Sequence, residues 1–75
     1  MKKLSELEIN QEAIIFKLNC NDELKQRFYS FGIIKGTPIK IDEISMAKNT
    51  IALDVDGTEI ALRIDEAKQI DVELV

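Results

Sequence analysis

The dipeptide Asp56-Gly57 separates two runs of alternating apolar residues in the second half of the chain. Both residue types tolerate the positive φ angles of a type I′ turn, so the dipeptide predicts a hairpin with a two-residue loop between strands 50–55 and 58–63. A two-residue loop fixes the strand register, which places one apolar set on the core face and sets Asp54 opposite Glu59 on the other face. The expected core face consists of Ile51, Leu53, Val55, Ile60 and Leu62.

The first half of the chain predicts one strand and one helix. Residues 12–18 have three consecutive apolar residues at their centre, Ile14-Ile15-Phe16, which is typical of an interior strand or of a strand with both faces covered. Residues 22–31 form the clearest helix, because Asn21 can cap its start and Gly32 can take the left-handed position that ends it. The apolar helical side chains expected to be buried are Leu24, Phe28 and Phe31.

The remaining segments predict further short strands. Residues 38–41 alternate as a strand, and Ile44 then falls out of phase, so we expect a bulge near Asp42-Glu43. A polar loop at 45–49, a helical turn at 65–68 and a last strand at 70–74 complete the pattern. Short strands with tight connections favour a small barrel over a parallel sheet. We therefore predict an all-β fold, a small, strongly bent barrel of about five strands with one short helix inserted after the first strand.

Length, charge and cysteine content limit the class of protein. The chain has 75 residues, and because no Pro- or Gly-rich stretch offers a linker, we expect a single domain over residues 1–75. The net charge of −4 argues against a nucleic-acid-binding protein, since phosphate binding needs clustered Lys and Arg. No apolar run matches a signal peptide or a membrane span, and the single cysteine agrees with a reducing compartment, so we expect a cytoplasmic protein.

The residue types available for chemistry argue against an enzyme. The chain has no histidine, which is the commonest general base at neutral pH. Cys20 precedes a helix start, where the helix dipole could lower the pKa of its thiol, but a free cysteine in a loop is the simpler interpretation. Asp54 and Glu59 are weak candidates for metal ligands, because the hairpin turn already explains that segment.

A partner-binding surface is a further hypothesis, formed by the wet side of the predicted helix together with the polar loop that follows. The candidate residues are Lys25, Arg27, Tyr29, Ser30, Met46, Ala47 and Lys48. Tyr and Arg are among the residue types that most often anchor protein interfaces. The alternative is an ordinary solvated helix face.

The chain as a whole resembles the FeoA family over about residues 4 to 73. The residues that carry the resemblance are Leu4-Ser5-Glu6-Leu7, Ala13 with Ile15, Leu24-Lys25-Gln26-Arg27-Phe28 running into Phe31-Gly32-Ile33, Gly36-Thr37, Ile60-Ala61-Leu62-Arg63, Glu66-Ala67 and Ile70-Asp71-Val72. Many members have Gly where Asn10 stands and Pro where Lys35 stands. The resemblance implies an SH3-like barrel and a small cytosolic accessory protein of bacterial ferrous-iron transport. It also implies a partner, the cytoplasmic G-protein region of the membrane transporter FeoB.

These considerations together predict a non-enzymatic module that docks on the GTPase region of FeoB, modulates ferrous-iron uptake and meets the membrane only through that partner. One alternative is a metallochaperone that carries Fe(II) on its acidic residues. Another is a generic SH3-like adaptor that binds peptides by strand addition at a barrel edge. We expect no required cofactor and only weak Fe(II) binding through carboxylates. The oligomeric state stays open.

Overall fold

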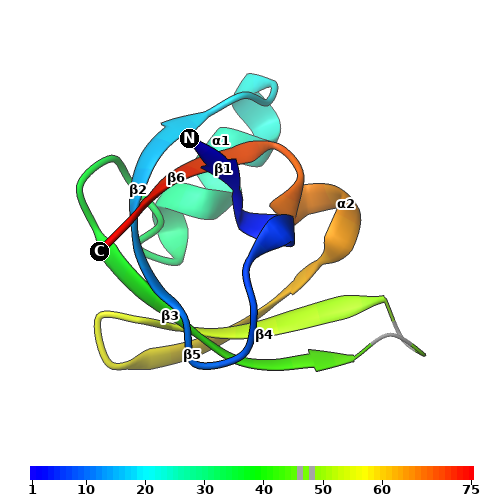
Figure 1. Ribbon diagram of the computed structural model, residues 1–75. Helices are drawn as coiled ribbons and strands as arrows, with labels where there is room; N and C mark the ends of the chain where they lie inside the picture. Colours follow the sequence, from blue (N-terminus) through cyan, green and yellow to red (C-terminus); the bar gives the residue numbers. More distant parts are fainter. Residues whose placement is uncertain (46, 48) are drawn as a thin grey trace.

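The computed structural model describes residues 1–45, 47 and 49–75, and these form one antiparallel sheet with three short helical segments (Figure 1). The strands are β1 (Lys2–Lys3), β2 (Glu12–Leu18), β3 (Pro38–Ser45), β4 (Thr50–Val55), β5 (Thr58–Arg63) and β6 (Ile70–Leu74). The helical segments are the 3-10 turn η1 (Leu4–Glu6), α1 (Asp22–Ser30) and α2 (Ile64–Ala67). Neighbouring strands follow the order β1-β6-β2-β3-β4-β5, so β1 and β5 are the edges of the sheet.

The β4–β5 hairpin has the predicted register throughout. Leu53 pairs with Ile60 and Asp54 pairs with Glu59. Asp56 and Gly57 have φ angles of 51° and 91°, as the type I′ turn requires. The Asp54 carboxylate Oδ1 accepts a hydrogen bond of 2.7 Å from the Gly57 N–H and so closes the turn. The expected bulge in β3 is also confirmed, since the β3–β4 register shifts between Ile41 and Glu43.

β2 spans the predicted residues and is an interior strand between β6 and β3. Its two faces differ. Ala13 and Ile15 are fully buried in the barrel, whereas Ile14 on the outer face keeps 40% of its surface exposed. The Lys35 ammonium lies 5.3 Å from the centre of the Phe16 ring and covers that outer face in part. The consecutive apolar residues therefore reflect an interior position in the sheet and not a second packed layer.

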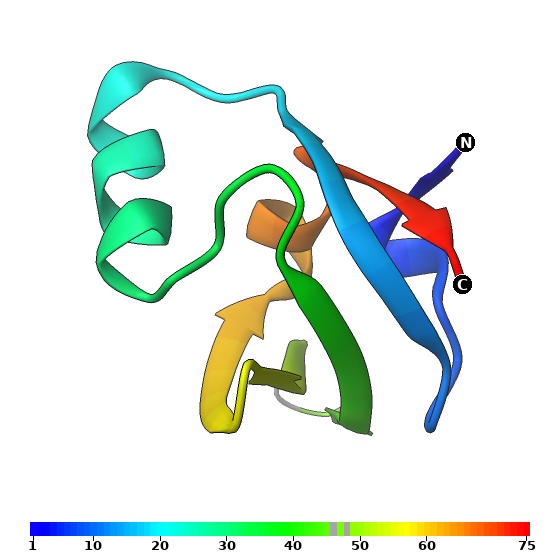
Figure 2. The same cartoon turned by 90° about the vertical axis from the view of Figure 1, so that its left-hand side faces the viewer.

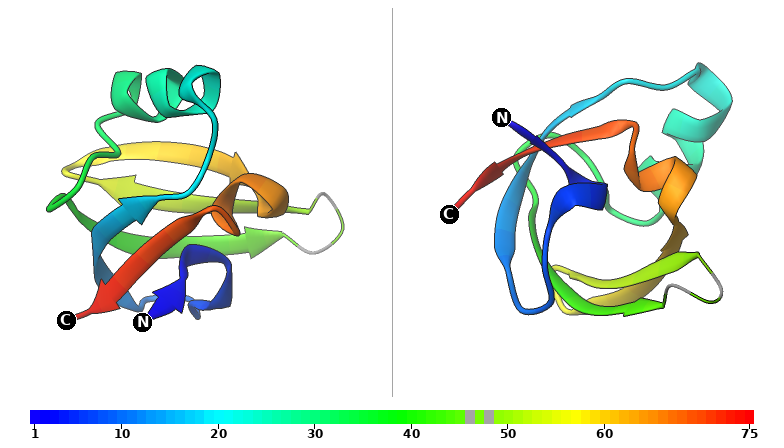
Figure 3. Two further views of the ribbon diagram at one scale, coloured as in Figure 1. Left: turned by 90° about the horizontal axis from the view of Figure 1, so that it is seen from above. Right: turned by 45° about the vertical axis from the view of Figure 1, so that its right-hand side comes forward.

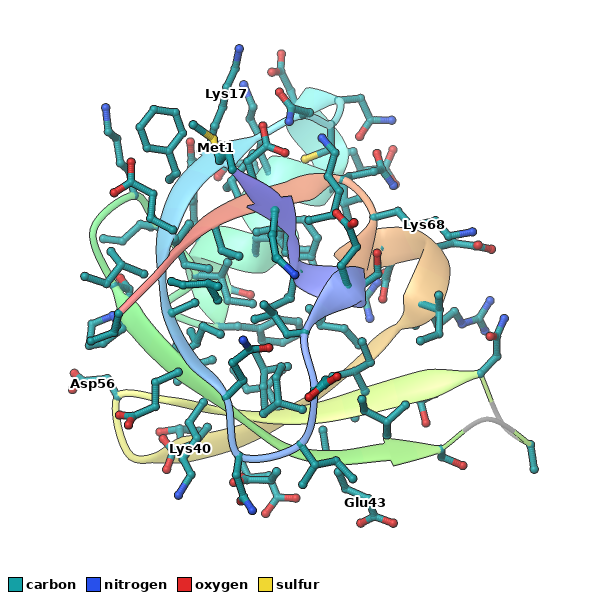
Figure 4. All side chains as sticks on the ribbon, viewed as in Figure 1. Met1, Lys17, Lys40, Glu43, Asp56 and Lys68 are labelled. Carbon is teal, nitrogen blue, oxygen red and sulfur yellow. The ribbon has the colours of Figure 1, made fainter. Side chains whose placement is uncertain are left out.

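The sheet coils into a barrel that is left unpaired between its two edges (Figures 1 and 3). At this seam α2 connects β5 to β6 and contacts η1. Charged side chains lie outside, as Lys17, Lys40 and Asp56 show in Figure 4. The buried core consists of Leu4, Leu7, Ala13, Ile15, Leu18, Phe28, Ile33, Ile39, Ile41, Ile51, Leu53, Val55, Ile60, Leu62, Ala67, Ile70 and Val72.

One strand more than expected is present, because two-residue β1 is too short to show a period in the sequence. β1 pairs with β6, so that Lys3 faces Asp71. The Lys3 ammonium forms an ion pair with the Asp71 carboxylate, whose other oxygen accepts a hydrogen bond of 2.7 Å from the Asn19 side chain. These contacts hold the N-terminus, β6 and the end of β2 together. The hydrogen bonds from Lys3 and then Asn19 lower the pKa of Asp71 below its usual value.

We expect the Asp71→Asn variant to lose stability at neutral pH and to lose less of it in acid. A lowered folded-state pKa means that the unfolded chain binds more protons, so the contribution of Asp71 is present above its unfolded pKa of about 3.9 and disappears as the pH falls through the folded pKa. Melting temperatures measured from pH 7 down to about pH 3 should therefore converge for the two proteins. Asp65→Asn, at an 82% exposed side chain, is the control and should change little. A gap between wild type and Asp71→Asn that stays constant with pH would contradict this.

Candidate functional site

Helix α1 is positioned by local capping at both ends. The Leu24 N–H donates to the Asn21 side chain over 2.9 Å, and Asp22 and Glu23 occupy the positive end of the helix dipole. The helix ends at Ser30, one residue earlier than expected. Gly32 follows with a φ of 84°, the left-handed conformation predicted for it, and its N–H donates to the Tyr29 carbonyl.

The packing of α1 against the barrel is looser than its apolar spacing indicates. Phe28 is its one fully buried residue, whereas Leu24 and Phe31, both expected in the core, are partly buried at its margin. Figure 2 shows the reason: α1 stands to one side of the barrel and is joined to it by extended connections at both ends. A helix in this position reaches the core with one side chain and leaves most of its surface to solvent.

The four helical residues of the predicted partner surface differ in their exposure to solvent and in their contacts with other residues. Tyr29 is 46% exposed, and Lys25 is partly buried. Ser30 is exposed, and its hydroxyl donates to the Arg27 carbonyl. The Arg27 guanidinium lies 5.6 Å from the centre of the Phe31 ring and forms an ion pair with Glu66 of α2. Arg27 thus connects α1 to the rest of the molecule. Its pairing with Glu66 could not be predicted from the sequence, because the two residues are 39 positions apart.

The predicted loop residues lie on a different surface. Met46 and Lys48 fall outside the described residues, and Ala47 is exposed. The ends of β3 and β4 that flank this loop project past another side of the barrel, apart from α1 (Figures 1 and 3). The helix and the loop therefore offer two separate surfaces, and their role in binding stays a prediction.

The contacts of the candidate metal ligands and of Cys20 are explained by the fold itself. Asp54 already accepts the turn hydrogen bond, and Glu59 faces it across the hairpin. Within the described part of the chain, no three His, Cys, Asp or Glu side chains gather closely enough to hold a metal ion. Cys20 is a free cysteine packed at the core margin, in agreement with the simpler interpretation, and burial raises the pKa of its thiol. Neither α1 nor α2, both fully described, has the length and apolar character of a membrane-spanning helix.

Comparisons with known proteins agree with this geometry. The FeoA domain family matches residues 2–74. A Campylobacter jejuni protein provisionally named Fe(2+) transport protein A is 44% identical over 72 residues, which cover 96% of this chain and 97% of the relative. The structure of a FeoA-like protein from Clostridium acetobutylicum superposes with a TM-score of 0.85 at 31% identity, over 100% of this chain and 91% of that one.

A third match is to a protein that is itself described by its fold. The crystal structure of FeoA from Stenotrophomonas maltophilia, complexed with zinc and described as a prokaryotic SH3 domain protein, has a TM-score of 0.83 and 27% identity, over 97% of this chain and 91% of that one. The six-stranded barrel with its side helix is thus a small SH3-like domain, as predicted. The chain belongs to the FeoA family, whose members are accessory proteins of ferrous-iron transport.

Proposed function

We propose that this protein is a non-enzymatic, cytoplasmic module that binds the G-protein region of a FeoB-type transporter and modulates ferrous-iron uptake. Family membership supports the link to iron transport. The absence of histidine from the sequence supports action by binding and not by catalysis. The effect on transport is then exerted through the conformation of the GTPase region.

One observation supports helix α1 as the docking surface. Phe28 is the one fully buried residue of α1, and this short helix, at one side of the barrel, presents Tyr29 and Lys25. A tyrosine combines a large apolar ring with a polar tip, which suits the centre of an interface. The switch regions of GTPases change shape with the bound nucleotide. A module docked near them binds one nucleotide state more tightly than the other.

The Tyr29→Ala, Lys25→Glu double variant should keep its fold and bind the purified GTPase region at least tenfold more weakly, about 1.4 kcal/mol. Calorimetric titration in the presence of GDP and of a non-hydrolysable GTP analogue measures this affinity, and circular dichroism checks the fold. Lys2→Glu is the matched control, because it reverses an exposed lysine on β1 that faces the apolar Val72 and should leave the affinity unchanged.

Two results would count against the proposal at different levels. If the folded double variant binds like the wild type, the helix is not the docking surface, and the surface around Ala47 is the next to test. If the wild type binds the GTPase region in neither nucleotide state, the partner itself is wrong. Anaerobic titration with Fe(II) tests the expectation of weak metal binding, and a stoichiometric site of submicromolar affinity would favour the metallochaperone.

A further inference from the structure

Strand β5 is an edge of the sheet with a defined set of unpaired backbone groups. In a two-residue hairpin the residues next to the turn exchange hydrogen bonds, so Thr58, Ile60 and Leu62 direct their backbone groups toward β4. The alternate residues Glu59, Ala61 and Arg63 direct theirs away from the sheet. Such an edge is a template for another strand.

This edge is open to solvent. A groove of about 570 Å³ separates β5 from the end of α1, and it is lined by Ser30, Phe31, Gly32 and residues 58–61. The side chains of Glu59, Ala61 and Arg63 are all exposed. Arg63 is the exception among the edge residues, because its N–H donates to the Glu66 carboxylate over 3.0 Å and its carbonyl, at the N-cap of α2, accepts the first hydrogen bond of that helix. The free groups are thus centred on Ala61, which is small enough to let a second backbone approach.

The charges on β5 are complementary to a second copy of the same strand. Glu59 and Arg63 lie two residues to either side of Ala61 and on the same face of the sheet. When two β5 strands run antiparallel with Ala61 opposite Ala61, Glu59 of each copy lies opposite Arg63 of the other. The arrangement is isologous, so one contact generates its symmetric counterpart.

We propose that two copies of this protein associate through antiparallel pairing of their β5 edges about Ala61. The Ala61 N–H of each copy donates to the Ala61 carbonyl of the other, and the Glu59 side chain of each copy meets the Arg63 side chain of the other. Arg63 keeps its own N–H on Glu66. The pairing joins the two sheets into one continuous sheet.

A repulsion between two carboxylates within the monomer favours a second copy of β5 as the strand that pairs with this edge. Glu59 faces Asp54 across the hairpin, and like charges at facing positions are unfavourable. Asp54 has Lys40 opposite it on β3, whereas Glu59, on the edge strand, has no cation at a facing position. In the pair, the Arg63 guanidinium of the second copy flanks Glu59 on the side away from Asp54 and relieves this repulsion. Tyr29 has no part in the β5 contact, so the inference goes beyond the proposed docking on the transporter and does not depend on it.

The test is a charge exchange followed by sedimentation velocity over a concentration series up to the millimolar range. Wild type should show a monomer–dimer equilibrium. Glu59→Arg and Arg63→Glu should each weaken association at least tenfold, because like charges then meet at both symmetric positions. The double variant with both substitutions should recover the association of the wild type. Glu59→Arg also faces Asp54 with a cation, so the monomer itself should not lose stability.

A second variant tests the backbone pairing directly. Ala61→Pro removes an N–H that points away from β4, a position at which an edge strand tolerates proline, so the fold should persist while association is lost. A wild type that is monomeric throughout overturns the proposal, as do single charge reversals without effect. Association that persists in folded Ala61→Pro would mean that the copies meet elsewhere. A monomeric wild type whose Glu59 and Ala61 amide signals shift on adding the GTPase region would assign the edge to the transporter instead.

Discussion

Phe28→Ala is expected to destabilise the protein by about 3–5 kcal/mol, the usual range for removing a buried phenylalanine. Phe28 is fully buried and is the single residue by which α1 enters the core. Its carbonyl also accepts hydrogen bonds from Phe31 and Ile33, so the turn after the helix depends on its position. Its loss both opens a cavity at the mouth of the barrel and releases the helix. Urea unfolding followed by circular dichroism measures the change.

Tyr29→Ala is the matched control for this prediction. It removes an aromatic ring from the same helix at the neighbouring position, but the ring is 46% exposed. Its effect on the free energy of unfolding should stay within about 0.5 kcal/mol, as for most surface substitutions. If Phe28→Ala and Tyr29→Ala cost the same, α1 is not held by Phe28. The Phe28 variant should also bind the GTPase region more weakly if α1 is the docking surface.

Leu53→Ala should cost about 2–5 kcal/mol, the range measured for buried leucines. Leu53 has no exposed surface and lies at the centre of β4, between Ile41 of β3 and Ile60 of β5. Because all three strands contribute to one core, the cavity cannot close by moving a single side chain. Differential scanning calorimetry gives the change in stability.

The chain offers a control with the same chemical change. Leu74 ends β6 and is 45% exposed, so Leu74→Ala removes the same atoms from a site that water already reaches. Its cost should be below about 1 kcal/mol, because less apolar surface returns to water. A Leu53→Ala variant as stable as Leu74→Ala would mean that the hairpin turns its other face to the core.

The two proposed interaction surfaces adjoin at the groove between β5 and the end of α1, but they use different side chains and can be separated by mutation. Tyr29 and Lys25 belong to α1, whereas Glu59 and Arg63 belong to the edge of β5. Variants at one surface should leave the other measurement unchanged. A dimer joined through β5 would present two α1 helices, so self-association and docking on the transporter are compatible.

The elements predicted from the sequence are those controlled by nearby residues. The turn at Asp56-Gly57 fixes the β4–β5 register because both residues accept positive φ. Asn21 and Gly32 define the ends of α1 within one residue, since capping is a contact over three or four positions. Asn10 also has a positive φ, of 71°, a conformation that glycine and asparagine adopt more readily than other residues.

The tertiary structure alone decided how these elements meet. β1 could not be predicted because its two residues pair with β6 through contacts between Lys3 and Asp71, which are 68 positions apart. The partial burial of Phe31 and the pairing of Arg27 with Glu66 depend on where α1 stands relative to the barrel. So does the open edge of β5, since a strand is an edge only by the arrangement of all the others. Turns and helix caps depend on contacts within a few residues of the chain, so they can be predicted from the sequence. The coiling of the sheet brings together residues that are far apart in the chain, and the sequence by itself does not show which of these become neighbours.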